Sequence, residues 1–421
     1  MRHRVDLIYF NAGGGHRAAA LALQAVTCEQ NRPWDVRLVN LSDVLDPGGR
    51  FRKLTGMAPE DIYNKRLARG WTLGLAQELK LLQGMIRLGH DSLLRKLQQH
   101  WLATEPDLVV SLVPNFNRAL YQSVTSTLPG VPFVTVLTDM ADHPPHFWIE
   151  PNQQQHLVCG TPRAVAQARA AGYADRLIWP TSGMILRPDF YGGAPVDRAA
   201  QRMALGLDPA RPTGLVMFGG QGSMQMTRMA KALRDVQLIL MCGHNDALAT
   251  QLRAQRSAAP HAVVGFTPEV RRHMQLGDFF IGKPGPGCLS EAVQCGLPVI
   301  TFENAWTMPQ ERYNAQWVRE RGVGLVLKSA RLIRPGVDEL IHRLPEFCAR
   351  LQGLDNRAVF EVIDILAQLL QVACTPSVDG LEARLGDATG SASALRSMIS
   401  SRPSACSTNA VRLSTQSPSL Q

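Results

Sequence analysis

Short runs of apolar residues alternate with longer segments of helical apolar spacing through most of the chain. Apolar runs of this length, bounded by Gly, Pro or Asp, predict buried strands. The predicted strands of the first part are residues 5–10, 36–41, 108–113, 133–137 and 156–159. Helical patterns cover 17–27 and 163–171. This alternation predicts βαβ units built around a parallel sheet.

A second series of the same kind follows residues 187–213, which are rich in Pro, Gly and Arg and typical of a linker. Its predicted strands are residues 214–218, 237–241, 262–264, 279–281 and 299–302. Helical patterns begin near 226 and cover 288–295. We expect an α/β domain at 1–187, a linker at 188–213, a second α/β domain at 214–355 and a closing helix at 356–374.

The remaining residues, 375–421, are rich in Ser and poor in large apolar side chains, so we expect a disordered tail. No apolar run approaches the roughly 18 residues that a membrane span needs. The apolar run at 5–10 is too short for a signal-peptide core, so we expect a cytoplasmic protein. Eight cysteines without a CxxC pair argue against a zinc site and a disulfide framework.

The formal net charge of +9 is unevenly distributed, and residues 51–100 hold nine Lys and Arg against four Asp and Glu. Within this region, residues 71–102 combine many Leu residues with basic ones in an amphipathic pattern. Such a helix can lie in an anionic membrane interface, or it can pack on the protein's own sheet. By itself the charge also fits a surface that only keeps the protein in solution.

The first predicted strand leads into a triple-glycine loop that ends in Gly14, Gly15 and His16. Glycines at this position allow the backbone to approach a ligand, and the following helix offers free N–H groups. The loop is not GxGxxG and lacks a correctly spaced acid for a ribose, so a dinucleotide is disfavoured. His16 lies at the carboxyl end of a strand, where open α/β sheets bind ligands.

Asp139 follows the predicted strand 133–137, so its carboxylate is expected at the same edge of the sheet. An acid there can act as a general base, although Asp is also common as a turn or helix-cap residue. His143 and His146 flank two prolines, but no third metal ligand is evident, so we expect no metal site.

The second part contains several Gly-rich loops. The loop at 219–223 resembles a phosphate loop but lacks the Lys-Ser/Thr ending, which disfavours NTP hydrolysis. The loop at 282–287 precedes a helix that carries Glu291, a residue able to accept both ribose hydroxyls or simply to suit the helix dipole. Gln310 and Glu311 follow the last predicted strand and could hold sugar hydroxyls.

In order, the motifs are GGGHRA at 13–18, TD at 138–139 followed by His-Pro at 143–144, FGGxGS at 218–223, CGxN at 242–245, KPG at 283–285 with SEA at 290–292 and CGLPVI at 295–300, and QExxNA at 310–315. Together they resemble the monogalactosyldiacylglycerol synthase and processive diacylglycerol glucosyltransferase family. The peptidoglycan N-acetylglucosaminyltransferase that acts on lipid I is a more distant relative. The resemblance covers residues 5–372.

This resemblance implies a GT-B fold, in which two Rossmann-like domains with parallel sheets face a central cleft. It implies an inverting transfer of a hexose from a UDP-sugar to diacylglycerol or a related lipid, at the cytoplasmic face of a membrane. It also implies no cofactor, no essential metal and no nucleic-acid partner.

Carried over by motif, Asp139 and His16 become the catalytic candidates, with Asp139 as base. The acceptor side comprises Gly14, Gly15, His16 and His143. The donor side comprises Gly220, Gly222, Ser223, Gly243, Phe266, Pro284, Gly285, Glu291, Gln310 and Glu311. Within it, the resemblance assigns Phe266 to the uracil, Glu291 to the ribose, and Gln310 and Glu311 to the hexose.

Two other functions compete with this hypothesis. A UDP-N-acetylglucosamine 2-epimerase of the GT-B type would share the nucleotide-binding half but would not need the basic apolar stretch 71–102. A non-catalytic lipid or nucleotide binder would not need His16, Asp139 and Glu291 together.

Overall fold

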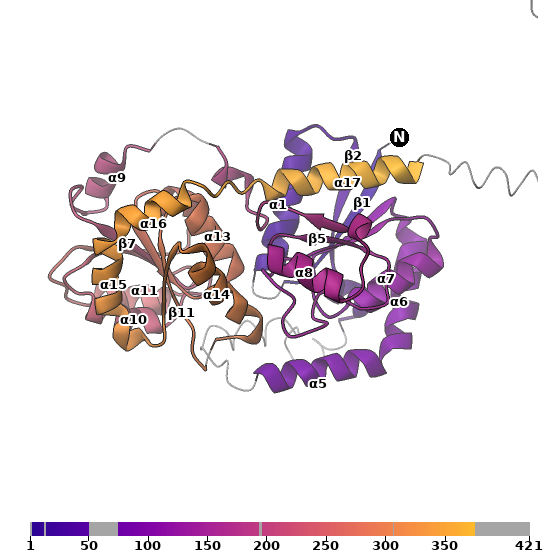
Figure 1. Cartoon of the computed structure of the whole chain (residues 1–421), viewed down its shortest axis with the longest axis horizontal. Coiled ribbons are helices and arrows are strands. Elements are labelled where there is room, and N and C mark those ends of the chain that lie inside the picture. Colours follow the sequence, from indigo (N-terminus) through magenta and orange to yellow (C-terminus); the bar gives the residue numbers. More distant parts are fainter. Residues whose placement is uncertain (1, 12–13, 50–74, 193–195, 306, 375–421) are drawn as a thin grey trace, which may run out of the picture. The chain divides into compact units, whose positions relative to one another are not determined.

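A computed structural model describes residues 2–11, 14–49, 75–192, 196–305 and 307–374 of the chain (Figure 1). The described residues up to Ala373 form one compact unit. The expected disordered tail at 375–421, Gly13 of the first loop, and residues 71–74 of the basic stretch lie outside the described residues.

The first half contains a six-stranded sheet in the order β2-β1-β3-β4-β5-β6, and every neighbouring pair is parallel. Its strands are β1 His3–Tyr9, β2 Trp34–Asn40, β3 Leu108–Ser111, β4 Phe133–Val136, β5 His156–Cys159 and β6 Ile178–Pro180. All residues of β3 and β4 are buried, as expected for parallel strands covered on both faces. The parallel α/β arrangement predicted for this half is confirmed.

Helices cover both faces of this sheet (Figure 1). On one face, α1 (Gly15–Glu29) and α17 (Ala358–Cys374) pack against Val5, Leu7 and Val110. On the other face, α6 (His90–Thr104) and α7 (Asn117–Thr127) pack against Ile8 and Val109. The remaining elements of this half are α2 Leu41–Leu45, α5 Leu75–Leu88, α8 Pro162–Ala170, η1 Asp175–Leu177 and η2 Pro188–Phe190. The expected closing helix therefore belongs to the core of the first half, although it follows the second half in sequence.

The second half contains another six-stranded parallel sheet, in the order β12-β11-β10-β7-β8-β9. Its strands are β7 Thr213–Met217, β8 Gln237–Met241, β9 His261–Val264, β10 Phe279–Gly282, β11 Val299–Phe302 and β12 Gly324–Leu327. Renumbered within this half, the order is the 3-2-1-4-5-6 arrangement of a Rossmann sheet.

The helices of the second half also lie on both faces of their sheet. One face packs against α13 (Pro286–Gln294) and α14 (Arg312–Arg321). The other packs against α10 (Gln225–Ala232), α11 (Asp246–Arg253) and α15 (Ile333–His342). The shorter elements are α12 Val270–Met274, α16 Leu344–Leu351, η3 Pro309–Glu311 and η4 Ala330–Leu332.

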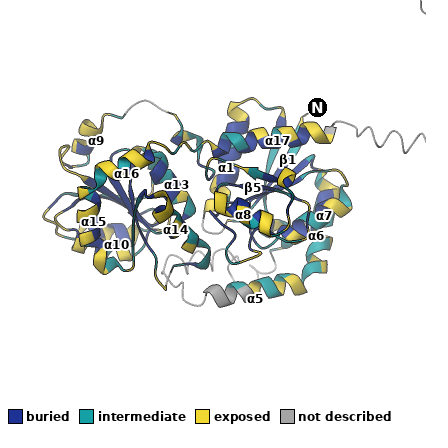
Figure 2. Cartoon of the chain, in the orientation of Figure 1, coloured by how far each residue is buried: buried dark blue, intermediate teal, exposed yellow. Residues whose placement is uncertain are grey.

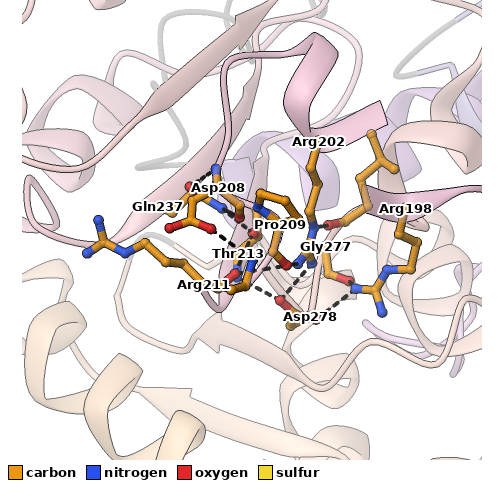
Figure 3. Close-up of polar contacts among 11 residues, drawn as sticks. Arg198, Arg202, Asp208, Pro209, Arg211, Thr213, Gln237, Gly277 and Asp278 are labelled. Atoms are coloured by element: carbon orange, nitrogen blue, oxygen red, sulfur yellow. Dashed lines mark hydrogen bonds and ion pairs between the residues drawn. The ribbon is translucent and has the colours of Figure 1, made fainter. Parts of the chain in front are cut away.

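The stretch that we expect to be a linker contains an additional helix, α9 (Arg198–Ala204), which is tied to the second half by a charged network (Figure 3). The guanidinium of Arg202 is buried, pairs with Asp278 at 2.7 Å and donates to the carbonyl of Leu276 at 2.8 Å. Arg198 pairs with the other oxygen of Asp278 at 2.7 Å. Removing Asp278 would leave the buried guanidinium of Arg202 without its counter-charge, which is destabilising. Much of this stretch is therefore a packed part of the second half.

The basic amphipathic stretch forms two helices, α5 and α6, that are separated at Gly89. On α6, Leu97 and Trp101 are buried against the first sheet, so packing on the protein's own core explains this part. On α5, Leu81, Met85 and Leu88 are 65%, 54% and 91% exposed. Figure 2 shows exposed positions along this helix. Among the helices that the structure describes, none is long and apolar enough to span a bilayer.

Candidate functional site

The strand order of the first sheet marks one edge as the expected ligand site. The chain leaves β1 toward β2 on one side and later adds β3 on the other, so the order reverses between β1 and β3. Ligands of open parallel sheets bind beyond the carboxyl ends of strands at such a reversal. The loop after β1 carries Gly14, Gly15 and His16, and Asp139 follows β4, which lies two strands along from β1 beyond β3. The topology thus brings the acceptor-side candidates to one edge.

His16 lies in the first turn of α1 and is held by two polar contacts. Its Nδ1 is 3.1 Å from the Thr138 hydroxyl, and its ring also hydrogen-bonds to the backbone of Leu112, just beyond β3. Burial lowers the pKa of His16 to about 4, despite the opposing effect of the Leu112 bond. His16 is therefore neutral at physiological pH. Gly14 precedes it as the N-cap of α1 with a φ of 82°.

Asp139 is 9% exposed and has one hydrogen-bond donor, the indole Nε1–H of Trp148, at 2.9 Å from Oδ2. Burial raises the pKa of Asp139 to about 7, the Trp148 bond opposes this rise, and the charges of Glu311 and Lys283 act on it in opposite directions. A carboxyl group with a pKa near neutrality is suited to accept a proton at physiological pH.

Trp148, which the sequence did not single out, joins the two catalytic candidates. It is fully buried, donates to Asp139, and its ring centre lies 6.0 Å from that of His16. His143 lies earlier in the same loop and is half-buried, and burial, followed by the charge of Arg312, lowers its pKa. The only feature of the sequence that could have identified Trp148 is its position in the loop that follows β4.

The second sheet has its own reversal of strand order, between β7 and β10. The loops after these two strands are the Gly-rich segments at 219–223 and 283–285. They approach each other, since a Cβ placed on Gly219 would lie 3.7 Å from Cε of Lys283. The predicted donor loops therefore also meet at a topological switch point, where a Rossmann sheet binds a nucleotide.

Two glycines of this edge are required by their surroundings. Gly222 and Gly243 both have a φ of 59°, in the left-handed region. A Cβ on Gly222 would lie 2.6 Å from the carbonyl oxygen of Cys242, and a Cβ on Gly243 would collide with the carbonyl oxygen of Gly220. The loops after β7 and β8 thus pack backbone to backbone, and Ser223 follows them just before α10.

An aromatic pair adjoins these loops. The rings of His244 and Phe266 are stacked, with centroids 3.8 Å apart and planes inclined by 19°. The backbone N–H of His244 donates to the carbonyl of Gly220 at 2.9 Å, and Phe266 is 62% exposed. The predicted uracil contact Phe266 therefore has a ring partner that sequence reasoning did not name.

Glu311 has a protein partner. Its Oε1 accepts from Nζ of Lys283 at 2.9 Å, and the residue is only 5% exposed. Asn314 donates to the carbonyl of Pro284 at 2.8 Å, which holds the second loop. Gln310 is half-buried in the same short helix as Glu311. Glu311 thus positions Lys283, a cation beside Gly285 that was absent from the predicted donor set.

Glu291 lies on α13, and burial raises its pKa to about 7 while the charge of Arg187 lowers it. Arg187 comes from the segment that joins the two halves. The donor-side residues after β7, β8, β9, β10 and β11 are thus gathered along one edge, with Glu291 one helix turn beyond it.

A hollow of about 300 Å³ occurs at the opposite, amino edge of the second sheet, lined among others by Arg198, Asp278 and Cys295. None of the predicted site residues lines it. Within the described ranges no three His, Cys, Asp or Glu side chains gather as a metal site would require.

Comparison with known proteins finds a matching domain family for the second half of the chain. Residues 216–358 match the glycosyltransferase family 28 C-terminal domain. The chain is 27% identical over 408 residues to a probable monogalactosyldiacylglycerol synthase of Glycine max, covering 87% of this chain and 72% of that protein. It is 27% identical over 363 residues to monogalactosyldiacylglycerol synthase 1 of Arabidopsis thaliana, covering 78% and 63%. The chain thus spans about two thirds of these relatives' length.

Solved structures show the same fold. MurG of Acinetobacter baumannii matches with a TM-score of 0.55 and 13% identity, over 87% of this chain and all of that one. A putative UDP-N-acetylglucosamine 2-epimerase of Listeria monocytogenes matches with a TM-score of 0.50 and 13% identity, over 87% and 95%. The expected GT-B fold is confirmed, and so is the resemblance to the monogalactosyldiacylglycerol synthases.

Proposed function

Because the chain is a glycosyltransferase of the GT-B fold, related to the monogalactosyldiacylglycerol synthases, we propose that it transfers a hexose from a UDP-sugar to diacylglycerol or a related membrane lipid. The observation that carries this proposal is the environment of the Asp139 carboxyl group. This buried carboxyl has a pKa of about 7. The charge of Glu311 raises that pKa and the charge of Lys283 lowers it, so both residues of the donor side act electrostatically on Asp139. This arrangement suits a base that acts on an acceptor beside a bound donor.

In the proposed reaction, the acceptor hydroxyl gives its proton to Asp139 as its oxygen bonds to the anomeric carbon. The bond from that carbon to UDP breaks, and its electron pair leaves on the diphosphate. A single displacement of this kind inverts the anomeric centre. The neutral His16, fixed by Thr138 and Leu112, lines the acceptor side together with Gly14, Gly15 and His143.

The proposed donor site uses backbone groups for the diphosphate and side chains for the rest. Gly220, Gly222 and Ser223 would meet the diphosphate together with Gly243, Pro284 and Gly285. Phe266 would contact uracil, Glu291 the ribose, and Gln310 with Glu311 the hexose. Negative charge on departing UDP is favoured by Lys283 and by the N-terminal end of α13, so the proposal needs no metal and no cofactor.

We place the acceptor in an anionic membrane, contacted by α5. The exposed Leu81, Met85 and Leu88 offer an apolar face, and Arg87 on the same helix favours anionic headgroups. Replacing these three apolar residues with Ser is expected to reduce flotation with anionic vesicles. The matched control is Leu102→Ser on α6, which is 65% exposed but outside this face, and it should float normally.

The test is an assay with four radiolabelled donors, UDP-glucose, UDP-galactose, UDP-glucuronate and UDP-N-acetylglucosamine, against vesicles of total lipid extract. We expect label in the lipid phase from at least one hexose donor, unchanged by EDTA and appearing about 10²–10⁴-fold more slowly with the Asp139→Asn variant. No labelled lipid from any donor would overturn the proposal. Conversion of UDP-N-acetylglucosamine to its 2-epimer without lipid would identify the competing epimerase function.

A further inference from the structure

Trp148 belongs to a buried chain of hydrogen bonds that leads to Asp139. Its backbone carbonyl accepts from Nδ2 of Asn117 at 3.1 Å, and its backbone N–H donates to Asp142 at 2.6 Å. Asn117 is in turn bonded to the hydroxyl of Ser111, at the end of β3, at 2.6 Å. Both ends of the residue are thus tied to the scaffold, so the indole has little freedom to move.

The indole has a single donor, Nε1–H, and it is directed at Oδ2 of Asp139. A hydrogen bond to a carboxylate favours the charged form, whereas burial favours the neutral form. The indole therefore opposes the burial that raises the pKa of Asp139. Because the bond draws electron density from Oδ2 and makes it less basic, Oδ1 is the better oxygen to take a proton.

We propose that Trp148 is a positioning residue for the proton-accepting carboxylate, acting through its indole N–H on Asp139 and leaving Oδ1 to receive the acceptor proton. This inference rests on the proposed function, since it assumes that Asp139 is the base. It assigns to one fully buried side chain two effects: it fixes the orientation of the base, and it keeps the base ionised near neutral pH.

The test replaces Trp148 with Phe, which removes the N–H and keeps an aromatic ring. The rate of transfer at saturating donor is measured against pH. We expect the acid limb of the pH–rate profile, where protonation of the base slows transfer, to move up by about one to two pH units. This is the size that the loss of one hydrogen bond to a charged group predicts. We also expect an unchanged KM for the UDP-sugar, because the donor loops lie on the other sheet.

The matched control is Trp101→Phe. Trp101 is also fully buried in the first half, and its indole donates to the hydroxyl of Ser123 at 2.8 Å, away from Asp139. Its loss is expected to lower stability without moving the acid limb. An acid limb in Trp148→Phe that coincides with that of the wild type would overturn the inference. Absence of transfer by the wild type would instead overturn the proposed function.

A second measurement works even if Trp148→Phe does not fold. In wild-type protein with ¹⁵N-labelled tryptophan, one indole N–H resonance should shift with a midpoint near the acid limb of the rate profile. That titration should vanish in Asp139→Asn, which keeps an oxygen acceptor for the indole. If every indole resonance were independent of pH between 5 and 9, Trp148 would have no role in the titration of the base.

Discussion

The two halves of the molecule have similar sheets but different kinds of site. In the first half the catalytic candidates are side chains whose pKa values burial shifts, with His16 at about 4 and Asp139 at about 7. In the second half the candidates are mainly backbone at left-handed glycines, an exposed aromatic pair, and the ion pair of Lys283 with Glu311. Only Glu291 there resembles the first half, with a pKa raised by burial.

This difference corresponds to two physical tasks. A carboxyl group that accepts a proton near neutral pH is favoured by surroundings that exclude water, since burial raises its pKa toward that range. Binding of a diphosphate needs N–H groups that can approach the phosphate oxygens, which favours residues without a Cβ. The first half would then determine the rate, and the second half the affinity for the donor.

The largest effect is expected for Asp139→Asn. The amide can still accept the Trp148 hydrogen bond but cannot take the acceptor proton, so the transfer rate should fall by about 10²–10⁴-fold. UDP affinity, measured by calorimetry, should stay unchanged because the donor loops are intact. Near-normal turnover would remove Asp139 as the base.

The same variant should also differ from the wild type in how its stability depends on pH. The folded pKa of about 7 exceeds the usual value, so the stability linked to this carboxyl is present below about pH 4 and is lost as pH rises through 7. At about 1.4 kcal/mol per pKa unit, the loss amounts to a few kcal/mol, which Asp139→Asn avoids. Melting curves recorded from pH 4 to 8 should show that the melting temperature of the variant, relative to that of the wild type, rises with pH. A constant difference would contradict the burial of a titrating carboxyl.

A smaller effect is expected for Gly243→Ala. The added methyl group collides with the carbonyl of Gly220 at a left-handed φ, so the two loops must separate. We expect UDP affinity to fall by about 10-fold or more, equivalent to about 1.4 kcal/mol, with the acid limb of the rate profile unmoved. Gly192→Ala, where a Cβ meets nothing within 4 Å, is the control. A shifted acid limb would mean that the two sites are not separable in this way.

The smallest effect is expected for His244→Ala. If the ring supports Phe266 against the nucleobase, its loss removes an aromatic contact of about 0.5–1.5 kcal/mol, or about 2- to 10-fold in UDP affinity. The affinity for inorganic diphosphate should not change. Equal losses for UDP and diphosphate would place the effect in the loop backbone rather than in the ring.

Much of the fold could be predicted because buried parallel strands are continuous apolar runs. The predicted strand 156–159 matches β5, 237–241 matches β8, and 299–302 matches β11. Helix α9 was missed because its anchor is the pairing of Arg202 with Asp278, distant in sequence. The Gly/Pro/Arg composition of its segment indicates only a linker.

The site was predictable to the level of its loops but not of its contacts. Strand ends and glycines revealed where His16, Asp139 and Gly222 lie, since parallel topology brings strand ends to one edge. The bond from Trp148 to Asp139 depends on how one loop folds back, and no local pattern indicates that. Residues 71–74 of the basic stretch and the tail at 375–421 lie outside what the structure describes. The expectations for these two segments stay predictions.

The most direct test of single displacement with one carboxylate base is the anomeric configuration of the product. Glycolipid made from a ¹³C-labelled α-linked UDP-hexose would be isolated and examined by NMR. The account predicts a β-linked hexose in the wild-type product and product formation that is about 10²–10⁴-fold slower with Asp139→Asn. An α-linked product would contradict it, because retention requires either a second displacement or a front-side mechanism in which Asp139 does not act as proposed.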